Sequence, residues 1–356
     1  MANILDYLDW RSDVPFSVSP FNEIDGLILS EFVYLPFEGI VPHSFTLRIS
    51  IREAREQFLS ERIDENSRNF TFDRDLALFD RLACSERFGS TQMTGFIARN
   101  DEETQFSVIT FLLGDGTTYI AFRGTDNTLV AWKEDMNLSV MSATCAQELA
   151  CDYLNAHFIQ HPRPLRLGGH SKGGNLAIFA AAFCREEVRS RILAVQAYDS
   201  PGFREEIADS PEYAAILPKI STYIPESSVV GMLLNSRTDP VIVKSSGNNI
   251  EQHFAFNWEV RRDCFSEAAA LSGSGDRISR ALAAWINQYE DEQRRQLIDL
   301  VFGVLGATDA HTIQDLTRDK RSTVSAVVHA VRSLPNEQQK FLLDAFMGFA
   351  RSLNEG

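Results

Sequence analysis

The residue whose surroundings best suit it to chemistry is Ser171, within the sequence LGGHSKGGNLA. Gly169 stands two positions before it and Gly173 two positions after it. This G-x-S-x-G spacing is typical of a tight turn between a strand and a helix, with the serine at its tip. A serine held there is a candidate nucleophile, provided that a base and oxyanion donors lie beside it. The alternative is a glycine-rich turn that only packs a helix onto a sheet.

A base for this serine must be one of the seven histidines. In enzymes built on this turn, the chain order is serine, then acid, then histidine. His253 fits that order, in a loop that directly follows the strand-like sequence VIVKSS. The others precede the serine, lie in the turn itself or fall in the helical tail: His43, His157, His161, His170, His311 and His329. We therefore predict His253 as the base, against the alternative of an ordinary surface-loop histidine.

The acid has two main candidates, each at the end of a predicted strand on the same edge of the sheet as the serine. Asp199 ends the strand ILAVQAYD, and Glu226 follows ISTYIP. Asp239, in TDPVIV, precedes its strand and would lie at the opposite edge. Asp199 ranks first because its short side chain sits at a strand tip, Glu226 ranks second and Asp239 third.

Oxyanion donors are expected from the sequence YIAFRGTDN and from the turn itself. Gly124 permits a close backbone approach, and Thr125 offers both its N–H and its hydroxyl. The backbone N–H of Lys172, the residue after the serine, is the other predicted donor. Arg123 and Asp135 are interpreted as structural residues that hold this loop through hydrogen bonds. Alone, FRGT would fit an ordinary strand and turn equally well.

Strands and helices alternate from about residue 119 to residue 255. The predicted strands are YIAFRG, LRLGGH, ILAVQAY, ISTYIP and VIVKSS, with helical patterns such as CAQELACDYLNAHFIQH between them. This alternation predicts an α/β fold with a mostly parallel sheet. Residues 1–90 have mostly helical patterns, a β-region with hairpin-like turns follows, and the signal is helical from about residue 276. We expect one domain over residues 1–275, including the N-terminal helical segment, and a helical extension over residues 276–356.

Composition narrows the possible partners and compartment. The net charge of −15 argues against nucleic acid, because phosphate binding needs a basic face. The five cysteines are widely spaced without a CxxC pair, so neither a disulfide framework nor a zinc site is expected. MANILDYLDWRSD does not resemble a signal peptide, and the apolar run LAIFAAAFC is too short to span a bilayer. These features favour a cytoplasmic protein that needs no metal or organic cofactor.

The sequence YIAFRGTDNTLVAWKEDMN followed by LGGHSKGGNLA resembles class 3 lipases, whose pattern is FRG[ST], Trp-x-x-Asp and GHSxGG. Trp132 and Asp135 match the Trp-x-x-Asp element. A closer resemblance, over most of residues 20–260, is to the bacterial Mbeg-like family of α/β-hydrolases, through LGGHSKGGNLA, PGF and SSVVGMLL. The resemblance implies an α/β-hydrolase fold, an esterase-type triad and an oxyanion role for Thr125. It implies no substrate, since members of the family lack an assigned one.

One position departs from the lipase pattern. Class 3 lipases carry an aspartate shortly before a valine in the acid loop, whereas PESSVVG has Ser228 near that place. Either Glu226 takes the role of the acid, or the acid is Asp199.

Together these features predict a serine hydrolase that cleaves a carboxylic ester, such as an acylglycerol or a lysolipid, through an acyl-enzyme on Ser171. The apolar segments NTLVAW and MNLSVM either line an acyl pocket, form a lid or belong to the core. Two other classes stay open. One is a catalytically lapsed fold that binds a lipid or a protein. The other is an interaction protein whose C-terminal helices bind a partner.

Overall fold

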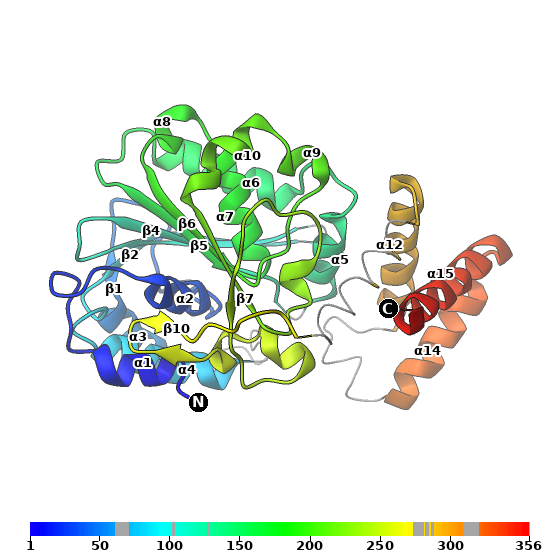
Figure 1. Cartoon of the computed structure of the whole chain (residues 1–356), viewed down its shortest axis with the longest axis horizontal. Helices are drawn as coiled ribbons and strands as arrows, with labels where there is room; N and C mark the ends of the chain where they lie inside the picture. Colours follow the sequence, from blue (N-terminus) through cyan, green and yellow to red (C-terminus); the bar gives the residue numbers. More distant parts are fainter. Residues whose placement is uncertain are drawn as a thin grey trace.

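In the computed structural model, an eight-stranded sheet with strand order β1 to β8 runs through the main body of the molecule (Figure 1). The structure describes residues 1–60, 71–101, 104–126, 128–272, 281, 285, 288–308 and 320–355. Neighbouring strands from β1 to β4 are antiparallel, and those from β4 to β8 are parallel. The strands are β1 (Ile49–Ser50), β2 (Gln92–Asn100), β3 (Gln105–Leu112), β4 (Thr118–Phe122), β5 (Leu165–His170), β6 (Ile192–Tyr198), β7 (Ile220–Pro225) and β8 (Val241–Val243). The predicted α/β class and the mostly parallel sheet are confirmed.

Helices cover both faces of this sheet. One face is packed by α1 (Ile4–Arg11), α2 (Glu23–Phe32), α3 (Ile51–Ser60) and α4 (Phe72–Cys84). The other is packed by α6 (Cys145–His157), α7 (Lys172–Phe183) and α10 (Pro211–Ile216). The shorter elements are α5 (Leu129–Asn137), α8 (Glu186–Arg189), α9 (Glu205–Ala208) and the 3₁₀ turns η2 (Leu217–Lys219), η3 (Val230–Met232), η4 (Asn249–His253) and η5 (Ala255–Asn257).

The central strands are apolar throughout because both of their faces are covered. In β4, Tyr119 and Ala121 point into the core under the N-terminal helices, whereas Ile120 and Phe122 point toward α6 and α7. Successive side chains of a strand point to opposite faces, so a sheet with two covered faces shows continuous apolar runs. The ends of these strands carry the candidate site.

The last three helices form a separate cluster beside α5 (Figure 1). They are α12 (Asp291–Gly306), α14 (Lys320–Ser333) and α15 (Asn336–Glu355), with a small apolar core of their own. An ion pair of 2.7 Å between Lys133 and Asp299 joins α5 to α12. The helical pattern predicted from about residue 276 onward lies partly outside the described residues. Within the described part of the chain, no helix is both long enough and apolar enough to cross a membrane.

The N-terminal helices and the end of the sheet domain close on each other. The short antiparallel pair β9 (Val260–Arg261) and β10 (Cys264–Phe265) lies beside α2 (Figure 1). The backbone N–H of Val260 donates a hydrogen bond of 2.9 Å to the carbonyl of Ala2. Trp258 and Phe265 stack edge-on near Tyr198 of β6. Chain segments from opposite ends of the domain therefore complete one core.

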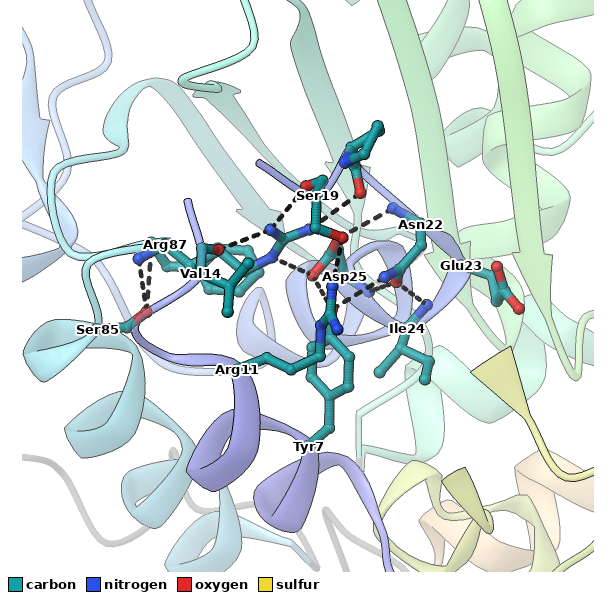
Figure 2. A network of polar contacts seen from close by, with 12 residues as sticks. Tyr7, Arg11, Val14, Ser19, Asn22, Glu23, Ile24, Asp25, Ser85 and Arg87 are labelled. Carbon is teal, nitrogen blue, oxygen red and sulfur yellow. Dashed lines mark hydrogen bonds and ion pairs between the residues drawn. The ribbon is translucent and has the colours of Figure 1, made fainter. Parts of the chain in front are cut away.

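Figure 2 shows a buried ion pair that ties these N-terminal elements together. The pair is formed by the guanidinium of Arg87 and the carboxylate of Asp25, and neither side chain is exposed to solvent. Asp25 Oδ1 accepts hydrogen bonds from Arg87 Nε at 2.9 Å and from the Tyr7 hydroxyl at 2.8 Å. Arg87 Nη1 donates to the carbonyls of Val14 and Ser19, both at 2.9 Å. The ion pair and its hydrogen bonds thus hold together α1, α2 and the loop between them.

Removing this cation is expected to destabilise the fold strongly. In Arg87→Met, the Asp25 carboxylate stays buried without its partner, which typically costs about 3–5 kcal/mol. The control is Arg81→Met, since Arg81 pairs with Asp9 where both side chains are exposed, and such pairs contribute about 0–1 kcal/mol. Urea unfolding measures both free energies. Equal losses in the two variants would contradict this account.

Candidate active site

Ser171 lies in a strained turn between β5 and α7. Its backbone has φ 57° and ψ −132°, which L residues rarely adopt. A Cβ on Gly169 would stand 2.2 Å from the carbonyl carbon of Gly173, and one on Gly173 would stand 2.1 Å from the carbonyl oxygen of Phe122. Only glycine fits at either position, so the turn can bring β5, α7 and the end of β4 together. The spacing read from the sequence thus has a steric cause.

His253 and Asp199 form a close pair at the end of the neighbouring strand. His253 Nδ1 lies 2.6 Å from Asp199 Oδ2, with the Asp199 side chain almost fully buried. Asp199 directly follows β6, and its φ of 43° places it in the left-handed region, which aspartate tolerates. Because a carboxylate can only accept, Nδ1 of His253 carries the proton. Nε2 is then the ring nitrogen that can accept one.

The Asp199 carboxylate is oriented by the loop that follows β7. Its Oδ1 accepts hydrogen bonds from the Ser228 hydroxyl and, at 3.0 Å, from the backbone N–H of Gly231. Ser228 is the residue near the place where the lipase pattern has an aspartate. In the sequence, Ser228 is notable only as a departure from the lipase pattern. In the structure, its hydroxyl donates a hydrogen bond to Asp199.

The two other carboxylates do not meet the histidine. Glu226 follows β7, but its Oε1 accepts from the backbone N–H of Ser245 at 3.5 Å. Asp239 is exposed and precedes β8. Among the described residues, Asp199 is the acid that hydrogen-bonds to His253.

A second histidine, His170, supports the loop that carries His253. Its Nε2 lies 2.7 Å from the His253 carbonyl oxygen, and its Nδ1 lies 3.2 Å from the Tyr34 hydroxyl. Burial, and next the neighbouring His253, hold the pKa of His170 well below its usual range, so the ring is neutral. Nε2–H therefore donates to His253, and Nδ1 accepts from Tyr34. His170 lies within the turn and was therefore not predicted as the base, and no sequence motif points to Tyr34.

The imidazole of His253 stands 4.5 Å from the ring of His170, centroid to centroid, which keeps it next to the turn. No hydrogen bond joins the Ser171 hydroxyl to His253 in the part of the chain that the structure describes. Such contacts are often long before a substrate binds.

The loop with Gly124 runs directly alongside the serine. A Cβ on Gly124 would stand 2.5 Å from the backbone carbonyl oxygen of His170 and 3.1 Å from Ser171 Cβ, so glycine is again required. The hydroxyl of Thr125 donates to Asp135 Oδ2 at 2.5 Å. The hydroxyl proton of Thr125 is engaged there, and among the described residues no hydrogen bond is made by its backbone N–H. Asp135, interpreted from sequence as structural, holds this loop.

The side chain of Lys172 is buried and anchored. Lys172 Nζ lies 2.7 Å from Glu134 Oε2, and it donates to the carbonyl and side-chain oxygens of Gln105 at 2.9 and 3.0 Å. Glu134 and Asp135 are consecutive residues of α5. Through these two carboxylates, the helix binds the side chains of both predicted oxyanion residues, Lys172 and Thr125. Glu134 was missed from sequence, because nothing in its local pattern points to Lys172.

Burial raises the pKa of two carboxyl groups, those of Asp135 on α5 and Glu31 on α2. Burial raises the pKa of Asp135 to about 6, although Lys172 and the hydrogen bond from Thr125 act in the other direction. Burial and the adjacent Asp75 raise the pKa of Glu31 well above its usual range.

As for metals, no group of three or more His, Cys, Asp or Glu side chains that could hold an ion occurs among the described residues.

The strand order, the serine at the turn after β5 and the acid–histidine pair at the strand ends define an α/β-hydrolase fold. The chain belongs to the Mbeg1-like family, whose model matches residues 82–303. This confirms the family expected from LGGHSKGGNLA and its companion phrases.

Solved lipases are similar at low identity. A fungal lipase in an inhibitor complex, described as a model for interfacial activation, is 16% identical with a TM-score of 0.36; the match covers 68% of this chain and 78% of that one. M37 lipase is 15% identical with a TM-score of 0.35, and the match covers 59% of this chain and 69% of that one. No curated protein matches significantly.

The strain at Ser171 predicts a stability difference between two variants. Ser171→Gly relieves the unfavourable backbone, a gain of about 1–3 kcal/mol, offset partly by the greater freedom of glycine in the unfolded chain. Ser171→Ala removes the same hydroxyl and keeps the strain. We expect the glycine variant to be more stable by about 1 kcal/mol in urea unfolding. An alanine variant of equal or higher stability would contradict a strained turn.

The raised pKa of Asp135 predicts a pH-dependent effect of Asp135→Asn. The folded protein binds this proton more tightly than the unfolded chain, with pKa about 6 against 3.8. Folding is therefore penalised above about pH 6, and the penalty fades as pH falls toward 4. Relative to the parent, Asp135→Asn should be more stable at pH 7.5, with the gain shrinking over that window in thermal unfolding. A gain that is independent of pH would contradict the shift.

Proposed function

We propose that this protein is a serine hydrolase that cleaves a carboxylic ester through an acyl-enzyme on Ser171. The observation that carries the proposal is the 2.6 Å bond between His253 Nδ1 and Asp199 Oδ2, beside a serine held at a strained strand-to-helix turn. Nucleophilic acyl transfer needs an acid that fixes the histidine tautomer and a serine placed at the same edge of the sheet.

The reaction divides among the residues as follows. Ser171 Oγ attacks the ester carbonyl while His253 Nε2 takes its proton. The negative oxygen that forms accepts hydrogen bonds from the backbone N–H groups of Thr125 and Lys172. The alkoxide then leaves with the proton from His253, and water attacks the acyl-enzyme by the same route. Asp199 stabilises the imidazolium, and it is preferred to Glu226 because Glu226 does not contact the histidine.

For the substrate we favour an ester with an apolar acyl chain, such as an acylglycerol or a lysolipid. Trp132 and Met136, from the segments NTLVAW and MNLSVM around the oxyanion loop, keep substantial exposed apolar surface. Apolar side chains exposed near a site support recognition of an apolar group. A small-molecule ester is thus the expected partner, handled without a metal or organic cofactor.

The proposal also includes the setting of the enzyme. All five cysteines, each in the described part of the chain, are free thiols, which is typical of a reducing compartment. This supports a cytoplasmic location in a bacterium, as the family resemblance implies. We further infer that residues 1–275 form the hydrolase domain and residues 276–356 a helical extension.

A catalytically lapsed fold that binds a lipid or a protein is the second candidate. The observation in its favour is that no Ser171–His253 hydrogen bond occurs among the described residues. The same experiment separates the two functions.

The test is covalent labelling with a fluorophosphonate probe, followed by hydrolysis of p-nitrophenyl esters. Ser171→Ala should abolish labelling, and His253→Ala and Asp199→Asn should slow it on the order of 10²–10⁴-fold. Glu226→Gln is the matched control, with a change of less than about threefold expected, since it leaves the Asp199–His253 pair intact. Circular dichroism checks that each variant folds.

Folded parent protein that resists the probe would favour the binding-only function. Loss of labelling in Glu226→Gln, with Asp199→Asn active, would move the acid to Glu226.

A further inference from the structure

An apolar pocket lies where α5 meets the C-terminal helices. Its volume is about 200 Å³, and its walls come from Met136 of α5, Leu297 and Val301 of α12, Phe346 of α15, and Trp285. Figure 1 shows α12 between α5 and α15 at this side of the molecule. Among the residues that the structure describes, every side chain that lines the pocket is apolar.

The pocket sits at the edge of the small C-terminal core and opens to solvent. Phe346 is 58% exposed and Met136 is 36% exposed, so the rim is apolar and accessible. The indole Nε1 of Trp285 donates to the carbonyl of Ala345 at 2.8 Å, which satisfies its polar atom and fixes the ring.

The lining determines the class of ligand. A wall without charged or polar side chains cannot recognise a headgroup, so the bound part must be hydrocarbon and the polar end must stay in water. A dry apolar cavity of about 150 Å³ is enough to bind benzene, and this pocket is larger. The flexible thioether side chain of Met136 can adapt to the shape of a bound chain.

We propose that this pocket binds the hydrocarbon tail of a single-chain amphiphile, such as a fatty acid or the acyl group of an ester. Leu297 and Val301 line it from α12, and the exposed side chains of Met136 and Phe346 line it from α5 and α15.

The pocket is coupled to the candidate active site through α5. Met136 follows Asp135 and Glu134, which hold Thr125 and Lys172 respectively. The ion pair between Lys133 and Asp299 fastens the same helix to α12. A tail that fills the pocket therefore packs against the helix that positions the oxyanion residues. This coupling rests on the proposed function, whereas binding does not.

Binding is measured with Ser171→Ala protein, so that no turnover occurs, by quenching of tryptophan fluorescence with 12-bromododecanoate below its micelle concentration. We expect saturable quenching that Trp285→Phe largely removes and Trp132→Phe largely keeps. In competition, unbranched fatty acids of six to ten carbons should bind roughly fourfold tighter for each methylene added.

Val301→Phe fills the pocket and should weaken binding at least tenfold. Val328→Phe is the matched control on an exposed position of α14, with less than a twofold change expected. Absent saturation, or quenching that Val301→Phe leaves intact, would overturn the proposal.

Hydrolysis by the protein with Ser171 intact then distinguishes the two sources of the tail. If the tail belongs to the substrate, Val301→Phe raises KM for p-nitrophenyl dodecanoate by a much larger factor than KM for p-nitrophenyl acetate. If it belongs to a separate fatty acid, added decanoate alters hydrolysis of the acetate in the parent protein and not in Val301→Phe. Tail binding without either effect would overturn the coupling through α5. A protein that hydrolyses no ester but binds the tail would refute only the proposed function.

Discussion

The close approach of Gly169 and Gly173 is the constraint on which the rest of the structure depends. Both glycines lack the Cβ that would strike neighbouring backbone, so α7 can start directly above the end of β5 and against the end of β4. Ser171 takes up the angle between strand and helix in a strained backbone conformation. Proteins keep such strain where surrounding structure over-determines it. Here that structure is the parallel sheet, buried on both faces, whose strand ends also bring Asp199 and the Gly124 loop to the same edge.

Around this turn, polar groups that lie far apart in sequence are joined in pairs. Asp199 is held by Ser228 and Gly231, and His253 by Asp199 and His170. Two adjacent carboxylates of α5 hold Thr125 and Lys172. Each of these side chains is positioned by hydrogen bonds from another element, which pre-organises the geometry before a ligand arrives. The same helix, α5, also contacts the C-terminal helices, so the candidate site and these helices share one structural element.

Much of the sheet could be predicted from the sequence, because apolar strands between helical patterns have few alternative readings. The segments ILAVQAY and ISTYIP are β6 and β7 with the predicted bounds. Ser171 was found because steric crowding forces glycine at two fixed spacings. The acid was harder, since Asp199 and Glu226 both follow strand ends and only the course of the later loops separates them. Tyr34 and Glu134 left no local signal, because their partners lie 136 and 38 residues away.

The bond between Val260 and Ala2 has a consequence for how the chain acquires its structure. The first helix and the strand pair that completes its core come from opposite ends of the sheet domain. Contacts of such long sequence separation form late, since the entropy of closing the intervening chain must be overcome first. During synthesis, the apolar surface of the N-terminal helices therefore stays incompletely covered until the segment around Val260 has left the ribosome. The nascent chain depends over that interval on being shielded from other chains, a demand that the finished molecule no longer shows.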